Sequence, residues 1–274
     1  MAATTTTTAD VRHDELPSGP LWALRDSWNE ARRHLRAVPR SPELLVFATL
    51  QPIMFVLLFN YVFGGSVKLP GGGTYTQFLI PGVFAQTVVF GSAFTGIGLA
   101  EDLSKGFIDR LRSLPISQSA VLVGRTMSDM VRNILTFGVM LGVAFAIGFR
   151  FQGGIARGVL ASLLLLAFSY SFSWIQALIG LSVSSVEAAN SAGFIWMFPL
   201  TFVSSAFVPT ENMTPWLRWI AERNPFTIVT NAARALYSGA PAGNLVWSSL
   251  AWAAGITVLF AFLAIRKFGN SASR

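Results

Sequence analysis

Cysteine is absent from the 274-residue sequence, and its only two histidines, His13 and His34, precede the first long apolar run. The lack of cysteine excludes disulfides, thiolate nucleophiles and thiolate-bound zinc or iron–sulfur centres. Because no histidine falls within an apolar run, an imidazole ligand for metal or haem inside a membrane is excluded as well. We therefore expect no catalytic residue, no bound cofactor and no metal on this chain.

Charged residues are also scarce. They make up 12% of the sequence, against 53% for hydrophobic residues, whereas a soluble domain carries about twice that share of charge. The apolar residues fall in runs too long for the core helices of a soluble protein, which indicates a membrane protein. Lys and Arg outnumber Asp and Glu by 20 to 13. In a membrane protein, such an excess points to cytoplasmic loops rather than to nucleic acid.

Six stretches are candidates for crossing a bilayer, which takes about 20 apolar residues. Five contain no charged residue: 44–63, 75–100, 158–182, 188–208 and 245–265. The sixth, 134–149, is short by itself, so we extend it back to position 120 and predict a helix over 120–149. On this helix Arg125, Asp129 and Arg132 share one face, where an acid between two bases offsets part of its cost at the lipid interface. Gly138 and Gly142 would allow close packing of the same helix.

These spans predict an all-α polytopic membrane protein with both termini on one side. Fourteen Lys and Arg residues fall on that side and six on the other. By the positive-inside rule, both termini are cytoplasmic.

The N-terminal residues divide into two parts. Residues 1–20 lack the apolar core of a secretory signal and are predicted to form a disordered cytoplasmic tail. Residues 21–40 place Trp22, Leu24 and Trp28 opposite an arginine-rich face, which is typical of an amphipathic helix lying on a membrane surface. The alternative is a solvated helix, because Asp26 and Glu30 interrupt the apolar stripe. The domain with the six spans then occupies residues 41–274.

The first long cytoplasmic connection, residues 101–119, has a helical apolar stripe. Leu103, Phe107, Leu111 and Leu114 recur at intervals of four, four and three, and Pro115 ends the pattern. Such a helix suits docking into a groove of another protein. It equally suits lying on its own bilayer, and the pattern alone favours neither.

The external connection, residues 210–239, contains two N-cap and proline pairs, Thr214-Pro215 and Asn224-Pro225. They predict short helices over 215–223 and 225–237. Such a pair can dip into the outer leaflet and return, anchored by aromatic side chains, or it can cap the protein as plain external helices. The residues assigned to the re-entrant pair are Trp216, Trp219, Asn224, Pro225 and Phe226.

The order of these features resembles a known family. A surface helix, six spans, DRLRSLPIS at 109–117 after the second span and RNPFTIVTNAARAL at 223–236 before the last are similar to the membrane subunit of ABC type-2 exporters. The nearest likeness is to the daunorubicin/doxorubicin-resistance permeases of actinobacteria. The resemblance covers residues 21 to about 267, and it lies in the spacing of the motifs more than in any one of them.

The resemblance implies a half-transporter in the bacterial plasma membrane. Two permease chains, identical or different, would form the pore, and two separate ATPase subunits would bind from the cytoplasm with ATP and Mg. The absence of a GxxxxGK[ST] phosphate loop from the sequence agrees with a separate ATPase. The family's coupling helix maps onto residues 101–115, with contacts assigned to Glu101, Phe107, Arg110, Leu111, Arg112, Leu114 and Pro115.

Polar residues in the membrane part of the spans are uncharged, which suits an amphiphilic cargo and an energy source outside the membrane. We assign the cargo path to polar and aromatic residues of the second, fourth and fifth spans, namely Gln86, Tyr170, Trp174, Gln176 and Ser204. The function predicted is export of hydrophobic drugs or lipid-like natural products.

Three alternative functions differ in what they require of the sequence. A permease for lipid-linked polysaccharide or another cell-envelope glycolipid, from the same family, is left open by these residues. An ion-coupled multidrug carrier is disfavoured, because such carriers usually hold an acid or a histidine at mid-membrane. An intramembrane enzyme is disfavoured because the spans lack histidine, cysteine and paired acids.

The predicted topology can be tested with a reporter enzyme that is active only outside the cytoplasm. We expect activity when it is fused after Lys68, Gln152 or Glu222, and none after Lys105 or Lys267. An active fusion at Lys105 would contradict six spans with both ends inside.

Overall fold

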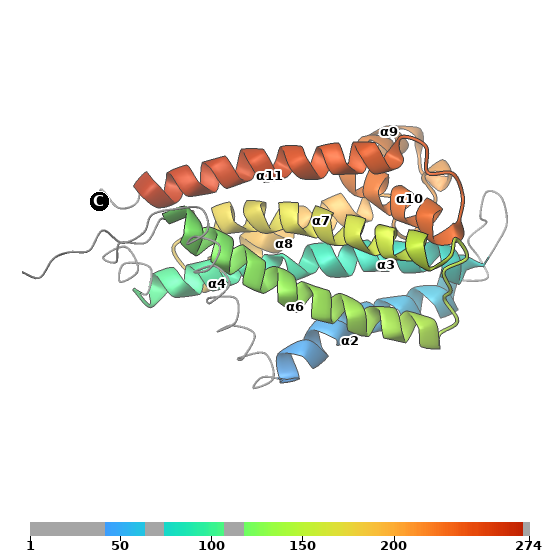
Figure 1. The fold of residues 1–274 in the computed structure, drawn as a ribbon, viewed down its shortest axis with the longest axis horizontal. Helices are drawn as coiled ribbons and strands as arrows, with labels where there is room; N and C mark the ends of the chain where they lie inside the picture. The colour runs from blue at the N-terminus through green and yellow to red at the C-terminus, as the bar shows by residue number, and fades with distance from the viewer. Residues whose placement is uncertain (1–41, 64–73, 107–117, 271–274) are drawn as a thin grey trace, which may run out of the picture.

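The computed structural model describes residues 42–63, 74–106 and 118–270 (Figure 1). Within these ranges, side chains are described for residues 50–59, 61–62, 74–106 and 122–269. The predicted tail and surface helix, residues 1–40, and positions 107–115 of the predicted coupling helix lie outside the described residues.

The regular structure of the described residues is helical, which confirms the all-α prediction. The elements in chain order are α2 (Pro42–Phe63), α3 (Tyr75–Gly91), α4 (Ala93–Ser104), α6 (Gln118–Ala146), α7 (Ile155–Gly180), α8 (Val186–Phe202), η2 (Thr210–Asn212), α9 (Pro215–Arg223), α10 (Pro225–Ser238) and α11 (Leu245–Asn270). Figure 1 shows the long helices running side by side, with α9 and α10 at one end and the end of α4 and the C-terminus at the other.

Four helical stretches in the described part are long and apolar enough to cross a membrane: Tyr75–Ser104, Leu122–Ala146, Ile155–Gly180 and Leu245–Gly269. They coincide with the second, third, fourth and sixth predicted spans. The first predicted span falls within α2. Its stretch with described side chains, Leu50–Phe59, is apolar but shorter than the four spans above. The fifth, α8, begins two residues before the predicted position 188 and ends at Phe202 rather than at position 208, so it is only 17 residues long.

Side chains from another helix explain why α8 can end early. Pro199 lies in its last turn and has no amide hydrogen to continue the helical ladder. Asn224 Nδ2 donates to the Leu200 and Val203 carbonyl oxygens, both at 2.7 Å. The backbone of the non-helical residues after Phe202 thus gains partners that a helix would have supplied, as backbone at membrane depth requires.

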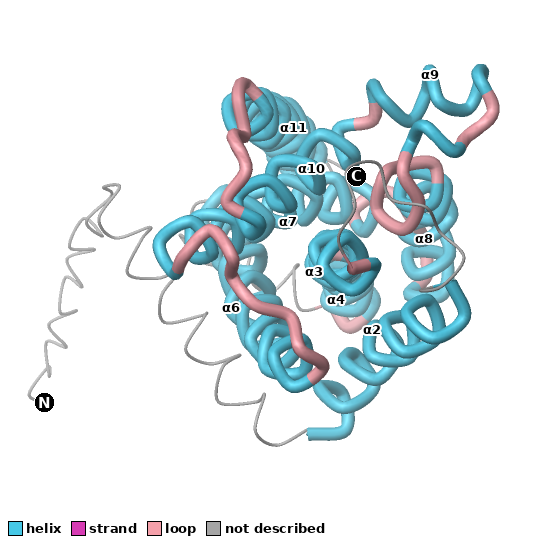
Figure 2. Tube along the Cα trace, turned by 90° about the vertical axis from the view of Figure 1, so that its right-hand side faces the viewer, coloured by secondary structure: helices cyan, strands magenta, loops and turns pink. Residues whose placement is uncertain are grey.

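The α3–α4 stretch lies at the centre of the bundle (Figure 2). In its most apolar window 78% of the residues are buried, against 17% for α11. Glycines bring it close to its neighbours: a Cβ at Gly180 would lie 2.3 Å from the Gly96 carbonyl oxygen, and one at Gly82 would lie 2.1 Å from that of Ala206. Gly138 and Gly142 do not bring another helix of the described chain close, because a Cβ at either meets nothing within 4 Å.

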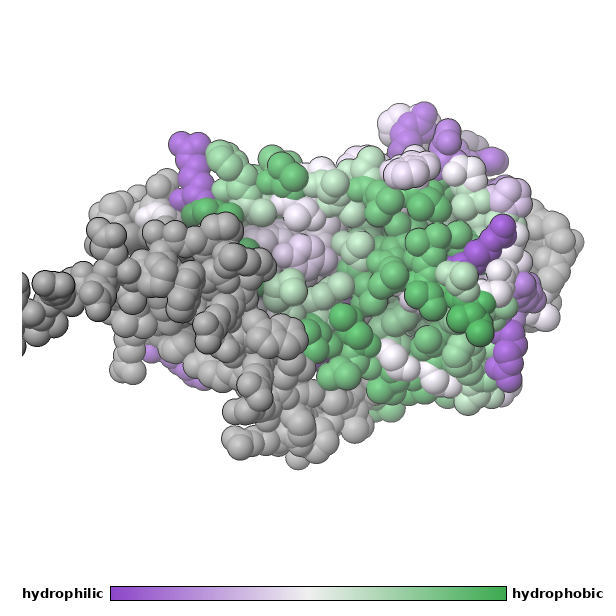
Figure 3. Space-filling model, in the orientation of Figure 1, coloured by the Kyte–Doolittle hydropathy of each residue, from purple (hydrophilic) through white to green (hydrophobic). Residues whose placement is uncertain are grey.

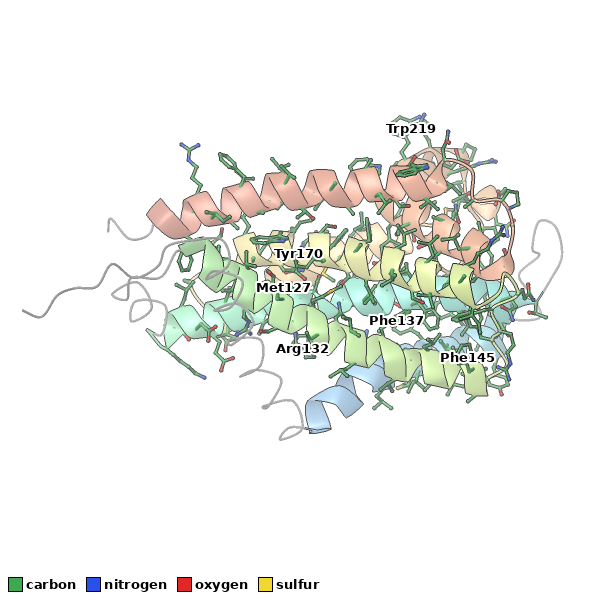
Figure 4. The ribbon with its side chains drawn as sticks, in the orientation of Figure 1. Met127, Arg132, Phe137, Phe145, Tyr170 and Trp219 are labelled. Carbon is green, nitrogen blue, oxygen red and sulfur yellow. The ribbon has the colours of Figure 1, made fainter. Side chains whose placement is uncertain are left out.

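The surface is apolar where a bilayer would cover it. On the face seen in Figure 3, hydrophobic side chains cover the middle of the described bundle, and hydrophilic ones gather at the end with α9 and α10. On α9, Trp216 and Trp219 are exposed. Trp219 points away from the bundle (Figure 4), a position typical of interfacial anchoring.

Candidate functional site

A chain of ion pairs joins α4 and α6 at the end of the bundle opposite α9 and α10. Arg125 contacts Asp102 of α4 at 3.0 Å and Asp129 at 3.3 Å, and Arg132 contacts Asp129 at 3.1 Å. Two acids and two bases alternate, so the chain carries no net charge. We call these four residues the α4–α6 ion chain.

The central members of the chain are shielded from solvent. The side chains of Arg125 and Asp129 are 15% and 7% exposed. Gly98 of α4 leaves room for the Arg125 side chain, because a Cβ at this position would lie 1.6 Å from the guanidinium. Arg132, labelled on α6 in Figure 4, lies 4.3 Å from the centroid of the Phe94 ring, a cation–π contact that partly replaces lost hydration. These contacts offset part of the cost of shielding Arg125 and Asp129 from solvent.

The sequence predicted three of the four members. The i, i+4, i+7 spacing of Arg125, Asp129 and Arg132 is confirmed as one ion-paired face. Asp102 was missed as a partner, because it lies 23 positions away from Arg125 and nothing in the local pattern links the two. The local signal that could have found it is a charge two residues after the end of the predicted span 75–100.

The beginning of the predicted coupling helix differs from the prediction. Glu101 belongs to α4, which continues without a break to Ser104, so these residues extend the second span rather than start a separate helix. Glu101 is exposed and accepts a hydrogen bond from Lys105 Nζ at 2.5 Å. The other six coupling residues lie outside the described residues, namely Phe107, Arg110, Leu111, Arg112, Leu114 and Pro115.

The five residues assigned to the cargo path do not share one surface. Trp174 is buried in a cluster with Leu99 of α4 and with Ala264 and Phe268 of α11. Tyr170, labelled on α7 in Figure 4, is half-buried and lies edge-on to Trp174 at 6.2 Å between ring centroids. These two aromatic residues therefore pack toward α11.

Gln176 turns to another neighbour, α8. Its Nε2 atom donates to the Gly193 carbonyl oxygen at 3.3 Å and to Met197 Sδ at 2.8 Å. Ser204 lies beyond the end of α8, where its hydroxyl donates to the Thr201 carbonyl oxygen and accepts from the Ala206 amide. Its polar group is therefore engaged in local backbone structure.

Gln86 of the central α3 is different. It is 4% exposed, and neither atom of its side-chain amide has a hydrogen-bond partner among the described residues. Gln176 Oε1 and Thr201 Oγ1 are likewise buried without a partner in that part of the chain. A buried amide without partners is costly, so Gln86 is the member of the predicted set with the most polar capacity to offer.

The predicted helices of the external connection are present. The bounds of α9 and α10 agree with those expected, to within one residue at the end of α10. Asn224 Oδ1 accepts from the Phe226 amide at 2.8 Å, which confirms the second N-cap. Thr214 occupies the N-cap position of α9 without a side-chain hydrogen bond to the helix. Phe226 is fully buried, whereas Trp216 and Trp219 are exposed.

One arginine ties α10 to the rest of this end. Arg234 donates to the Phe78 carbonyl oxygen at 3.1 Å, to Asn231 Oδ1 at 2.6 Å and to the Ser205 carbonyl oxygen at 2.9 Å. Burial lowers the pKa of Arg234 to about 9, while the charge of Glu211 acts in the opposite direction. The group thus stays protonated at neutral pH and fastens α10 to α3 and to the irregular residues after α8.

Known proteins were compared with the chain. Residues 28–237 match the family model described as ABC-2 type transporter. The daunorubicin resistance ABC transporter permease protein DrrB1 of Streptomyces coeruleorubidus is 35% identical over 238 residues, covering 87% of this chain and 84% of that protein. The probable doxorubicin resistance ABC transporter permease protein DrrC of Mycobacterium tuberculosis is 23% identical over 217 residues, covering 79% and 78%. A probable multidrug ABC transporter permease of Escherichia coli, YbhR, is 23% identical, covering 64% and 48%.

The ion chain predicts unequal effects of its two acids. Asp129→Asn removes the carboxylate between two guanidinium groups, and breaking a buried pair in this way costs about 3–5 kcal/mol. Asp102→Asn should cost less, because Asp102 is 29% exposed and Arg125 keeps Asp129. Thermal unfolding of the purified protein in detergent measures both.

The control for this comparison is Glu222→Gln, which breaks the exposed Arg218–Glu222 pair on α9 and should leave the unfolding temperature close to that of the unaltered protein. Equal stability of Asp129→Asn and Glu222→Gln would show that the charges of the α4–α6 ion chain do not stabilise the fold.

Proposed function

Because the chain belongs to the ABC-2 type transporter family, we propose that it is the membrane subunit of an ATP-driven exporter of hydrophobic or amphiphilic drugs or lipid-like natural products. The observation that carries the proposal is the likeness to a daunorubicin resistance permease over 87% of the chain. The uncharged polar groups of Gln86 in the central α3 and of Gln176 in α7 agree with a cargo of this kind and with energy supplied from outside the membrane.

The energy source we propose is a separate ATPase subunit, present in two copies, that binds ATP and Mg. The sequence contains no phosphate loop of its own. Two permease chains would then assemble with the two ATPases in the bacterial plasma membrane.

The proposed orientation has six spans and both termini in the cytoplasm. The alternating course of α2, α3–α4, α6, α7, α8 and α11 supports it, as does the excess of basic residues on the side of the termini. In this orientation the α4–α6 ion chain faces the cytoplasmic side, and α9 and α10 lie at the outer side, where a re-entrant arrangement is part of the proposal.

Coupling to the ATPase is assigned to residues 101–115. Because α4 continues to Ser104, a displacement of the following residues by the ATPase would be transmitted directly to the central helix. The Asp102–Arg125 pair joins the same end of α4 to α6, so both helices would receive the displacement. Apolar residues of the segment, Phe107 and Leu111, would enter an ATPase groove, with Arg110 at its rim.

Within the set assigned to the cargo path, we propose Gln86 and Gln176 as the residues that bind cargo. Both are buried; neither amide atom of Gln86 has a partner within the described chain, and Gln176 Oε1 has none there. Tyr170 and Trp174 pack toward α11, and the Ser204 hydroxyl bonds local backbone. Polar groups of a cargo, or water that moves with it, would supply the missing partners.

The coupling assignment predicts that Phe107→Ala and Leu111→Ala separate ATP hydrolysis from export. Truncating a buried apolar anchor commonly costs about 1–3 kcal/mol of association, so less ATPase should be recovered with the permease. Daunorubicin uptake into inside-out membrane vesicles should fall, with normal permease content. Arg110→Ala should be milder and more sensitive to salt, because a rim charge acts mainly on association rate.

The matched control is Ile155→Ala, an apolar truncation at the opposite end, where Ile155 is exposed. Uptake by the unaltered complex should require ATP and resist uncouplers of the proton gradient. Uptake driven by a proton gradient would favour a secondary carrier. ATP-driven movement of a lipid-linked glycan without daunorubicin uptake would favour a glycolipid permease.

The path assignment predicts a change of cargo range in Gln86→Leu. This variant removes a buried unpaired amide, so the protein should become more resistant to heat. Uptake of cargo that carries hydrogen-bonding groups should drop about tenfold relative to a purely apolar cargo. Ser249→Ala in α11, whose hydroxyl bonds its own helix, is the control. Identical uptake ratios in the two variants would remove Gln86 from the path.

A further inference from the structure

The central helix is interrupted at Ser92, where α3 ends and α4 begins. In a continuous helix the Ser92 amide would donate to the Val88 carbonyl oxygen. It donates instead to Val89 at 3.0 Å, and the Ser92 hydroxyl donates to the same oxygen at 2.6 Å. The Val88 carbonyl therefore loses its usual helical partner.

Two side chains from neighbouring helices donate hydrogen bonds to this carbonyl oxygen instead. Asn133 of α6 donates from Nδ2 to the Val88 oxygen at 2.7 Å and to Ser169 Oγ at 2.6 Å. Ser169 of α7 donates its hydroxyl hydrogen to the Val88 oxygen. Asn133 is 4% exposed and Ser169 is fully buried. We call this closed triangle of Val88, Asn133 and Ser169 the Val88 junction.

Gly91 makes the Val88 junction possible. A Cβ at this position would lie 2.2 Å from Asn133 Oδ1, so any side chain here would displace the asparagine. The residue is the last of α3, which places the space for Asn133 directly beside the interruption.

The Val88 junction stabilises the interruption of the central helix. At membrane depth a backbone carbonyl without a partner is costly, and Asn133 and Ser169 remove that cost. Without them the favourable alternative is to restore the bond between Ser92 and Val88, which would join α3 and α4 into one continuous helix. The interruption at Ser92 therefore depends on side chains of α6 and α7.

After the interruption, α4 has a second attachment to α6 near its end. Asn133 follows Arg132 directly in sequence, and Arg125 of the same helix holds Asp102 near the end of α4. From Ser92 to Asp102 is about 15 Å, so a turn of about 10° at the Val88 junction moves Asp102 by about 2–3 Å. That displacement is enough to break its contact with Arg125.

We propose that Asn133 and Ser169 are positioning residues for energy coupling. They fix the interruption between α3 and α4 as a pivot, so that displacement of the α4 end by the ATPase turns α4 as a unit and reaches the central α3. The inference rests on the proposed function, since it needs an ATPase acting on the residues that follow α4.

The test compares Asn133→Leu, Ser169→Ala and Gly91→Ala with the unaltered permease in complex with its ATPase in vesicles. Each variant removes or displaces one corner of the Val88 junction. Daunorubicin transported per ATP hydrolysed should fall about tenfold in all three, while ATPase recovery and basal hydrolysis are kept. Gly142→Ala on the open face of α6 is the matched control and should keep the full ratio.

A distance measurement reports the pivot itself. The chain has no cysteine, so spin labels attach only at Lys105→Cys and Ile155→Cys of each permease chain, at opposite ends of the bundle. Both positions are exposed. In the otherwise unaltered permease, addition of a non-hydrolysable ATP analogue should move the distance between the two labels from one narrow distribution to another. In the Asn133→Leu background that shift should be lost or broadened.

A purely structural role predicts something else. Permease yield and heat resistance would fall, but transport per ATP and the nucleotide-dependent distance shift would match the control, and this result would overturn the pivot. The milder Ser169→Ala keeps the test valid if Asn133→Leu does not fold. Absence of ATP-driven transport by the unaltered complex would overturn both proposals. A normal response of the junction variants, alongside uncoupling by Leu111→Ala, would overturn the pivot alone.

Discussion

The fold depends on one constraint, that every backbone amide and carbonyl at membrane depth must find a partner inside the protein. Helices meet it without help, and most of the described chain is helical. Where a helix stops within the bundle, a side chain from another helix has to supply the bond. Asn133 and Ser169 do so for Val88, and Asn224 does so for Leu200 and Val203.

Buried charges obey the same constraint. Asp129 lies between Arg125 and Arg132, and Arg234 is surrounded by carbonyl oxygens and an amide oxygen. Gln86 differs from these groups, because both polar atoms of its side-chain amide are buried without a partner in the described chain. Such an unpaired amide gives a cargo or a mobile water a reason to bind.

These bonds also suggest how the bundle could move without coming apart. The ion chain joins α4 to α6 and the Val88 junction joins α3 to α6, while the close approach of Gly96 to Gly180 joins α4 to α7. A helix held by such specific bonds can turn about one of them while its bonds at the others exchange. Under the proposed function, that motion would carry work from the ATPase side to the middle of the membrane.

The sequence by itself determined the helical class, most span positions, the caps of α9 and α10, and one charged face of α6. These features depend on the local hydrophobic period, on proline and asparagine at helix starts, and on i, i+4 spacing. Only the tertiary structure decided that Asp102 completes the ion chain, that α8 stops at Phe202, that Trp174 and Gln176 face different helices, and that Gly91 makes room for Asn133. Each of those depends on which helices become neighbours, and contacts between residues distant in sequence leave no periodic signal in the chain.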